Sequence, residues 1–248
     1  MLFKQKNELY QSKELSFLSY ALTSHRVVIY IARGKMQYVS LFKTFFNISL
    51  SLGALNYVMA ISESIHLKNK IIPQVIVNEA GTALSHYPEL EEVAIEFKFK
   101  PSLKKSFMKA QPKFSTLFKP KKKRSYVILM SETFKIDGLE LQIKDIPENV
   151  MIGWLGHELG HIMDYHRRNS LNLILFGLRY SISQNFIREA ERVADTYAVT
   201  HSMKDYILDT KKFILNNSSL SEKYKARIRR LYLSPDEILL LVKEQETK

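Results

Sequence analysis

The stretch GWLGHELGHIMDYH, residues 153–166, constrains the fold of this chain more than any other. It contains the pattern HExxH, formed by His157, Glu158 and His161. On a helix the two histidines stand one turn apart, so both imidazoles face the same way and can share one cation. Glu158 lies about 100° round the helix from His157. It can therefore reach a water on the metal without being a ligand itself.

The residues around this pattern predict that the helix is buried. The neighbours of the motif are uncharged: Leu155, Gly156, Leu159, Gly160, Ile162 and Met163. A helix that passes under a cleft has such flanks, whereas a surface helix more often carries charge there.

A catalytic zinc ion needs a third protein ligand and an open position for water. Because the chain contains no cysteine, that ligand must be a histidine or a carboxylate. His166 stands nine residues after His157, on the opposite helix face, and is a poor candidate. A metzincin-type third histidine is excluded, because the positions that would hold Gly and His are Asp164 and Arg167.

The strongly helical segment FIREAERVADTYA, residues 186–198, offers two carboxylates four residues apart, Glu191 and Asp195. One carboxylate can complete the metal sphere, while the other, a turn later, can accept the N–H of a ligating histidine. That second contact fixes the tautomer and orientation of the imidazole. Glu189 lies about 200° away from Glu191 on the helix, so we expect it to face elsewhere.

HELGH followed about thirty residues later by ERVAD resembles the HExxH and ExxAD motifs of gluzincin zinc metallopeptidases. This family includes the CAAX prenyl endopeptidases, the heat-shock membrane endopeptidases and the small soluble minigluzincins. The resemblance spans roughly residues 70–233. It implies that His157, His161 and Glu191 bind one catalytic Zn²⁺ ion. It also implies that Glu158 is the general base and that Asp195 supports a ligating histidine.

The chain departs from the membrane members of this family near its end. Those members commonly carry a His-Pro pair before an Arg-Ile helix, where this sequence reads SEKYKARI, residues 221–228. The group that stabilises the oxyanion of the tetrahedral intermediate is therefore open, with four candidates: Tyr197, His201, Tyr224 and Arg227. The clear multi-span membrane segments of those relatives are also missing, which favours the minigluzincin type.

These features predict a zinc-dependent metalloendopeptidase that cleaves a peptide or protein substrate with metal-activated water and a glutamate base. The strand expected at 125–130 is either an edge to which an extended substrate can pair or an ordinary core strand. One alternative function is a zinc-stabilised latent zymogen or regulatory protein. Such a protein would stay inactive until a segment such as residues 1–36 is removed.

The net charge of +12 is concentrated in residues 98–124, which contain 11 Lys or Arg and no Asp or Glu. This segment is either a solvated loop between two strands or a site for an anionic partner, such as acidic peptide, nucleic acid or lipid headgroups. Phe107, Phe114 and Phe118 within it could stack on bases. A protease or binding protein associated with nucleic acid is therefore a second alternative, although no nucleic-acid motif accompanies these residues.

The order of patterns predicts an α+β fold with helices, a small mixed sheet and then helices. Strands are expected at 71–77, 93–99, 125–130 and 139–141, with a turn at Gly138. Helix starts are expected near Pro147, at a capping box from Ser181 to Gln184, and at Ser234. We divide the chain into an N-terminal helical segment, 1–36, and a zincin-like metallopeptidase domain, 37–248.

Residues 37–68 predict a long apolar helix. Its stretch 39–61 is long enough to span a bilayer, but Lys43, Asn47, Asn56 and several serines interrupt it. We therefore favour a buried core helix over membrane insertion or surface attachment. The start of the chain lacks the apolar run of a signal peptide, and the absence of cysteine fits a reducing compartment. We expect a cytoplasmic protein, with peripheral membrane association as the alternative.

Overall fold

The computed structural model of the chain describes residues 64–101, 103, 106–136, 139–217 and 220–247. The predicted N-terminal segment 1–36, the apolar stretch 39–61 and the turn at Gly138 lie outside these residues. The α+β class is confirmed, because a small mixed sheet is followed by a series of helices. Within the described residues no helix has both the length and the apolar character needed to cross a membrane.

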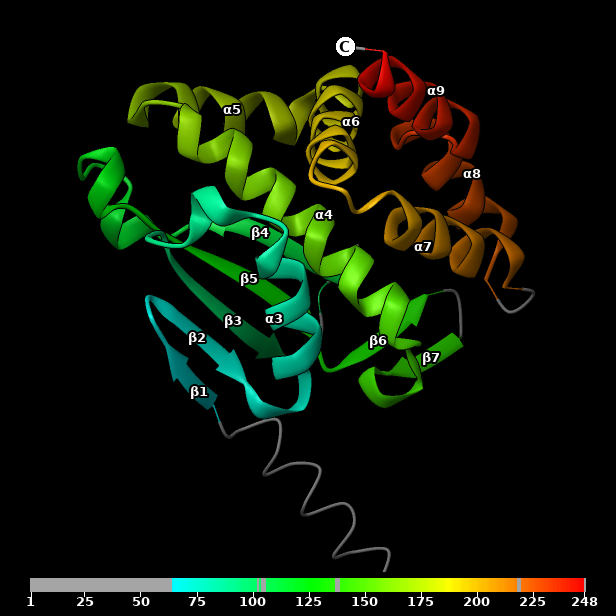
Figure 1. Cartoon of the computed structure of the whole chain (residues 1–248), viewed down its shortest axis with the longest axis horizontal. Coiled ribbons are helices and arrows are strands. Elements are labelled where there is room, and N and C mark those ends of the chain that lie inside the picture. Colours follow the sequence, from blue (N-terminus) through cyan, green and yellow to red (C-terminus); the bar gives the residue numbers. More distant parts are fainter. Residues whose placement is uncertain (1–63, 102, 104–105, 137–138, 218–219, 248) are drawn as a thin grey trace, which may run out of the picture. The chain divides into compact units, whose positions relative to one another are not determined.

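Five strands form one mixed sheet in the order β1-β2-β3-β5-β4 (Figure 1). Their bounds are β1 Ser64–Leu67, β2 Lys70–Pro73, β3 Ala94–Lys100, β4 Met108–Pro112 and β5 Ser125–Ser131. Strands β2, β3 and β5 run parallel, while β1 and β4 pair antiparallel with their neighbours. A separate antiparallel pair consists of β6 Thr133–Ile136 and β7 Leu139–Gln142.

The residues of these strands match their places in the sheet. Strand β3 reads AIEFKFK, in which Ile95 and Phe97 are buried and Lys98 is exposed. This is the alternation of a strand with one face on the core, and it confirms the strand predicted at 93–99. Strand β5 reads SYVILMS and is buried over most of its length, as a central strand should be. The strands predicted at 125–130 and 139–141 are confirmed.

Two predictions at the start of the described region are wrong in part, although the first three residues of the strand expected at 71–77 do lie in β2. The strand expected at 71–77 ends at Pro73, where a 3₁₀ turn begins, and Val77 starts helix α3, Val77–Ser85. The helix expected over 37–68 does not include its last residues, because Ser64–Leu67 form β1 in a hairpin with β2. Asn69 in that hairpin has a φ of 57°, a left-handed conformation that asparagine tolerates better than most residues.

The basic segment 98–124 is more than a solvated loop, which corrects that interpretation. Residues 108–112 form β4, which pairs with β5, and the ring of Phe107 packs 4.6 Å from that of Trp154. Strand β5 therefore lies between β3 and β4, so the interpretation of 125–130 as a core strand is confirmed and its alternative, an edge for a substrate, is wrong. Among the described strands, β4 is the edge at this end of the sheet.

Six helices follow the sheet: α4 Glu148–Arg167, α5 Ser170–Ile182, α6 Gln184–Thr200, α7 Lys204–Asn216, α8 Glu222–Leu231 and α9 Pro235–Glu246. Pro147 is the N-cap of α4, and Ser234 opens α9 with a capping box. The capping box predicted at Ser181 is wrong, because α5 continues through it. The cap of α6 is Ser183, whose hydroxyl accepts the N–H of Phe186.

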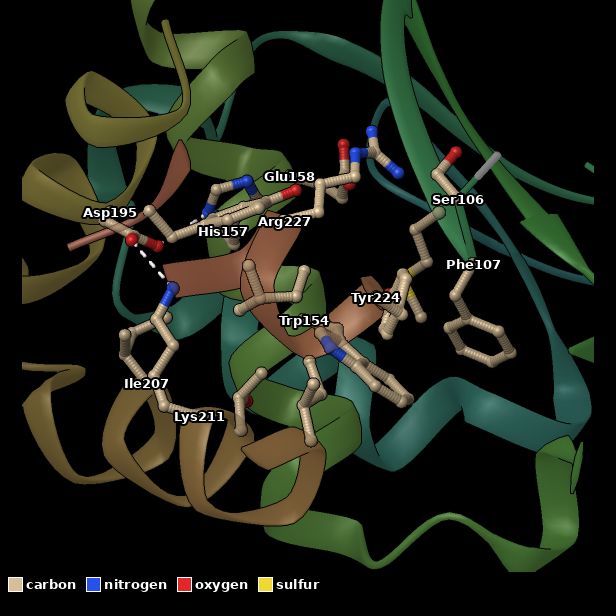
Figure 2. Close-up of a pocket in the computed structure, with 15 residues that line it drawn as sticks. Ser106, Phe107, Trp154, His157, Glu158, Asp195, Ile207, Lys211, Tyr224 and Arg227 are labelled. Carbon is tan, nitrogen blue, oxygen red and sulfur yellow. Dashed lines mark hydrogen bonds and ion pairs between the residues drawn. The ribbon is translucent and has the colours of Figure 1, made fainter. Parts of the chain in front are cut away.

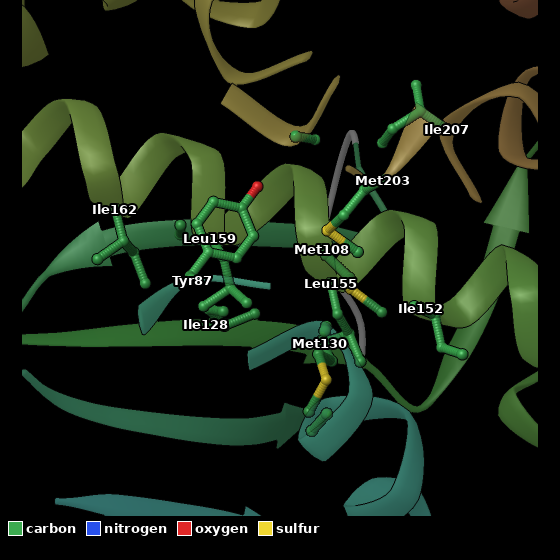
Figure 3. Packing of buried hydrophobic residues seen from close by; sticks show 14 of the residues in the cluster. Tyr87, Met108, Ile128, Met130, Ile152, Leu155, Leu159, Ile162, Met203 and Ile207 are labelled. Carbon is green, nitrogen blue, oxygen red and sulfur yellow. The ribbon is translucent and has the colours of Figure 1, made fainter. Parts of the chain in front are cut away.

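Helix α4 occupies the centre of this arrangement and packs against β4, α3, α6 and α7. Leu155 and Leu159 extend from α4 toward β5, where Met130 and Ile128 lie (Figure 3). On another side α4 approaches α6 closely at Gly160. A methyl group at that position would meet the carbonyl oxygen of Ala194, so glycine permits this approach. The sequence GHELGH thus brings its helix against α6.

Candidate metal centre

Helix α4 places the two histidines of the HExxH pattern in one buried site. The exposed fractions of His157 and His161 are 8% and 5%, and their ring centroids are 4.8 Å apart. The one-turn spacing expected from the sequence therefore brings both rings together.

Helix α6 adds the carboxylate of Glu191 to these histidines. Its Oε2 lies 3.1 Å from Nε2 of His157 and 3.5 Å from Nε2 of His161. Its other oxygen, Oε1, accepts a hydrogen bond from the hydroxyl of Tyr180, near the end of α5. Because Tyr180 holds one oxygen of the carboxylate, the other faces the two imidazoles.

The three side chains fit a divalent metal ion. One ligand atom from each of His157, His161 and Glu191 lies within 4.8 Å of the others, and all three residues are buried. Two imidazole nitrogens and one carboxylate oxygen are a donor set that zinc takes in catalytic sites, where a fourth position is left for water. Imidazole and carboxylate also bind other divalent transition metals, so the donors define a class of ion.

Asp195 contacts the ring nitrogen of His157 that faces away from Glu191, and the sequence predicted such a contact between this carboxylate and a histidine. Its Oδ1 lies 2.8 Å from Nδ1 of His157. Its Oδ2 accepts hydrogen bonds from Nζ of Lys211 on α7 at 2.8 Å and from the backbone N–H of Leu233 at 3.0 Å. These contacts fix the carboxylate and, through it, direct Nε2 of His157 toward Glu191.

Opposite charges set the ionisation of this cluster. Burial opposes the charge on His157, but hydrogen bonds to Asp195 and Glu191 raise its pKa to about 10. Burial also opposes the charge on Asp195, yet Lys211 and His157 lower the pKa of this carboxyl to about 2. Burial alone would raise the pKa of Glu191, but His161 and His157 hold it well below its usual range. Both carboxylates are therefore ionised at neutral pH, as metal binding requires, whereas His157 must release its proton to bind a metal ion.

Glu158 lies beside the two imidazoles, and its carboxylate is held by the sheet. Its Oε2 accepts the backbone N–H of Ala110 in β4 at 2.5 Å, and only 7% of the residue is exposed. Burial raises the pKa of Glu158 above its ordinary value, against the effect of His161 and His157. The edge strand thus positions this glutamate, a contact that the sequence did not reveal because β4 was not predicted.

A pocket opens next to His157 and Glu158. Its volume of about 630 Å³ includes the part that is open to solvent. Figure 2 shows Asp195 and Lys211 on one side of the pocket and Phe107 on the opposite side. His157 and Glu158 of the motif therefore both face this pocket.

The four oxyanion candidates fall into two pairs. Tyr224 and Arg227, both on α8, line the pocket. Burial raises the pKa of Tyr224 to about 12, so its hydroxyl keeps its proton and can donate at neutral pH. Tyr197 and His201 are not among the described residues that line the pocket. Instead, the ring of His201 stacks on that of Tyr87, with 4.6 Å between the centroids.

Three supporting residues were missed at the sequence level: Tyr180, Lys211 and Tyr232. The ammonium of Lys211 lies 4.3 Å from the ring centroid of Tyr232, and the centroid of that ring is 5.4 Å from that of His157. One signal was available, because Lys211 occupies an apolar face of α7 with Ile207 and Ile214. A lysine in such a position needs a buried partner, although the sequence does not say which one.

Comparisons with family models, with curated proteins and with solved structures found no match to this chain. The fold and the site therefore define the class: an α+β protein with a buried His-His-Glu cluster that can hold a metal ion.

Proposed function

We propose that the protein is a zinc-dependent metalloendopeptidase in which His157, His161 and Glu191 hold one zinc ion. The observation that carries the proposal is the convergence of these three buried donors from two helices, with Glu158 beside them. Asp195 adds the carboxylate support that ligating histidines commonly have. Zinc in this position would polarise a substrate carbonyl and make water a nucleophile at neutral pH.

Glu158 is the general base in the proposed reaction. It takes a proton from the attacking water as the oxygen bonds to the carbonyl carbon, and it passes that proton to the amine as the C–N bond breaks. The hydrogen bond from Ala110 keeps the carboxylate in one orientation. Its raised pKa brings it nearer to the range in which a carboxylate exchanges protons at neutral pH.

Strand β4 is the proposed surface for an extended peptide. The carbonyl of Phe107 and the N–H of Lys113 bond to β5, so the backbone groups of Met108 and Ala110 point the other way. A peptide can pair with such an edge through its main chain. Glu158 already takes the N–H of Ala110. Met108 lines the pocket, so its outward backbone groups are the proposed partners of the substrate, whereas Ala110 is buried.

Tyr224 and Arg227 are the proposed donors to the oxyanion of the tetrahedral intermediate. Both line the pocket beside His157 and Glu158, and hydrogen-bond donors that face the developing charge lower the reaction barrier. Tyr197 and His201 are the less suitable pair, because the pocket does not include them.

The test compares wild-type protein with Glu158→Gln in zinc content and in cleavage of an unstructured protein such as casein. We expect the variant to keep its zinc and to lose activity by about a hundredfold or more, because it lacks the base. Glu189→Gln is the matched control, since Glu189 is exposed on α6, and it should behave as wild type. Stable protein without metal contradicts the site, and full activity in Glu158→Gln contradicts the mechanism. Zinc-bound wild-type protein without activity favours the latent form.

A further inference from the structure

Helix α5 has apolar side chains on two opposite faces. Its inner face packs against the rest of the fold through Leu173 and Phe176, which are buried. The outer face consists of five aliphatic side chains with exposed fractions between 36% and 83%: Leu171, Ile174, Leu175, Leu178 and Ile182. Their spacing of i, i+3, i+4, i+7 and i+11 puts them in one strip, about 16 Å long at 1.5 Å per residue.

This outer strip is not needed to close the core. Single exposed aliphatic residues are ordinary on protein surfaces, but a contiguous group marks a site of interaction. Gly177 lies in the same helix, and a methyl group added there would meet no heavy atom within 4 Å. The outer side of α5 is thus open among the described residues.

Residues 114–124, which are rich in lysine and include two phenylalanines, are hydrogen-bonded to the start of this helix. The hydroxyl of Ser170 donates to the carbonyl of Leu117 at 2.7 Å, and the guanidinium of Arg124 donates to the carbonyl of Arg168 at 2.9 Å. Figure 1 shows the turns of this segment near the beginning of α5. Phe114 and Phe118 in these turns are 82% and 69% exposed. Two aromatic rings therefore extend the apolar surface beyond the helix.

Positive charge surrounds this apolar surface. Residues 98–124 and 165–188 contain no Asp or Glu at all. Lys119, Lys122 and Lys123 are exposed and make no ion pair within the described structure. A surface of this kind attracts a partner with many negative charges.

We propose that the outer face of α5, together with Phe114, Phe118 and the lysines at 119 and 121–123, binds the surface of an anionic lipid bilayer. Aliphatic and aromatic side chains enter the boundary between headgroups and acyl chains, while lysines contact the phosphates. A nucleic acid would also attract the lysines, but it would leave the five aliphatic side chains in water. Phe107, another aromatic residue of the basic segment, is 5% exposed and cannot stack on bases.

The experiment measures flotation of the full chain with vesicles of phosphatidylcholine alone or mixed equally with phosphatidylglycerol. We expect binding to the anionic vesicles at low salt and weaker binding as salt rises. Leu175→Gln with Leu178→Gln should weaken that binding by about tenfold or more, because less apolar area enters the bilayer. The matched control is Leu239→Gln with Leu240→Gln, two residues of α9 that are 46% and 57% exposed.

A second pair of variants tests the charge without altering the apolar strip. Lys122→Gln with Lys123→Gln should weaken binding to anionic vesicles by about thirtyfold at low salt. Lys223→Gln with Lys243→Gln, exposed on α8 and α9, should leave it unchanged. Thermal unfolding of each variant shows whether it is folded.

Three results would overturn the proposal. One is the absence of binding to anionic vesicles at low salt. Another is equal binding by the wild type and the α5 variant, which would place the contact elsewhere, for instance in residues 39–61. The third is a wild-type dimer that binds no vesicles and dissociates in the α5 variant, which would make this face a contact between two copies.

Discussion

Helices α4 and α5 follow each other in the chain, and the fold uses them in opposite ways. Helix α4 has 14 buried residues out of 20, with the sheet on one face and α6 and α7 on others. Helix α5 is the more apolar of the two, yet only Leu173 and Phe176 are buried in it. Apolar content therefore does not tell which helix is central. The position against β5 and the three glycines of α4 decide it.

The difference has an energetic consequence for the site. His157, Glu158 and His161 are buried because α4 is buried, and buried polar groups are costly unless they have partners. Asp195 supplies such a partner to His157, and the N–H of Ala110 supplies one to Glu158. On α5 the outer aliphatic residues are in contact with water, so they constrain the fold much less. Substitutions on the two helices should therefore differ in their effects.

The largest difference is expected for leucine truncation. Leu159→Ala on α4 should lower the free energy of unfolding by about 2–5 kcal/mol, because Leu159 is fully buried in the core. Leu178→Ala on α5, where the side chain is 58% exposed, should change it by about 0.5 kcal/mol or less. Urea denaturation of both variants measures this. Equal losses would contradict the exposed position of this face of α5.

Glycine substitution should give effects of opposite sign on the two helices. Gly160→Ala should destabilise the protein by about 1–3 kcal/mol, because the added methyl group pushes α4 away from Ala194 of α6. It should also weaken zinc binding, since the same helix pair carries the proposed ligands. Gly177→Ala on α5 should stabilise by about 0.5–1 kcal/mol, because the added methyl group has open space. Thermal unfolding and zinc titration check both; a stabilised Gly160→Ala contradicts the close approach.

A smaller loss of stability in acid is expected from the ion pair that joins α6 to α9. Arg192 on α6 pairs with Glu237 on α9 at 2.5 and 3.1 Å, and this contact lowers the pKa of Glu237 to about 2. Because this folded-state pKa lies below the ordinary 4.5, the pair stabilises the protein above pH 4.5. That contribution is lost as the pH falls from 4.5 toward 2. Glu237 is 41% exposed, so solvent limits the pair to about 1 kcal/mol or less.

Thermal unfolding as a function of pH tests this contact. Glu237→Gln should lower the melting temperature by a few degrees at pH 7 and by progressively less toward pH 2. Glu244→Gln, exposed on the same helix, is the control and should follow wild type throughout. A Glu237→Gln difference that stays constant with pH would assign the effect to packing instead of charge.

The most accurate predictions from the sequence concern residue spacings within a single helix or strand. The spacing of His157 and His161, and that of Glu191 and Asp195, each depend on the period of a single helix. That they meet in one site was a hypothesis from ligand chemistry, and the resemblance to gluzincins implied which carboxylate binds the metal. The alternation of β3 likewise marks a strand whatever its neighbours are.

The errors of the sequence analysis concern contacts between distant segments. Strand β4 is short and contains Lys109, and its pairing with β5 decides that it is a strand at all. The same pairing removes β5 from the edge of the sheet and gives Glu158 its partner at Ala110. Tyr180 and Lys211 reach the site from α5 and α7, with no fixed spacing from the histidines. No local pattern could reveal such contacts.

The most direct test is metal analysis of purified wild-type protein beside Glu191→Ala and Glu189→Ala. We expect close to one zinc ion per chain in the wild type and in Glu189→Ala, and far less in Glu191→Ala, because Glu191 faces the two histidines and Glu189 is exposed. Folded wild-type protein that takes up no zinc, or Glu191→Ala that binds it as tightly as wild type, would contradict the proposed site.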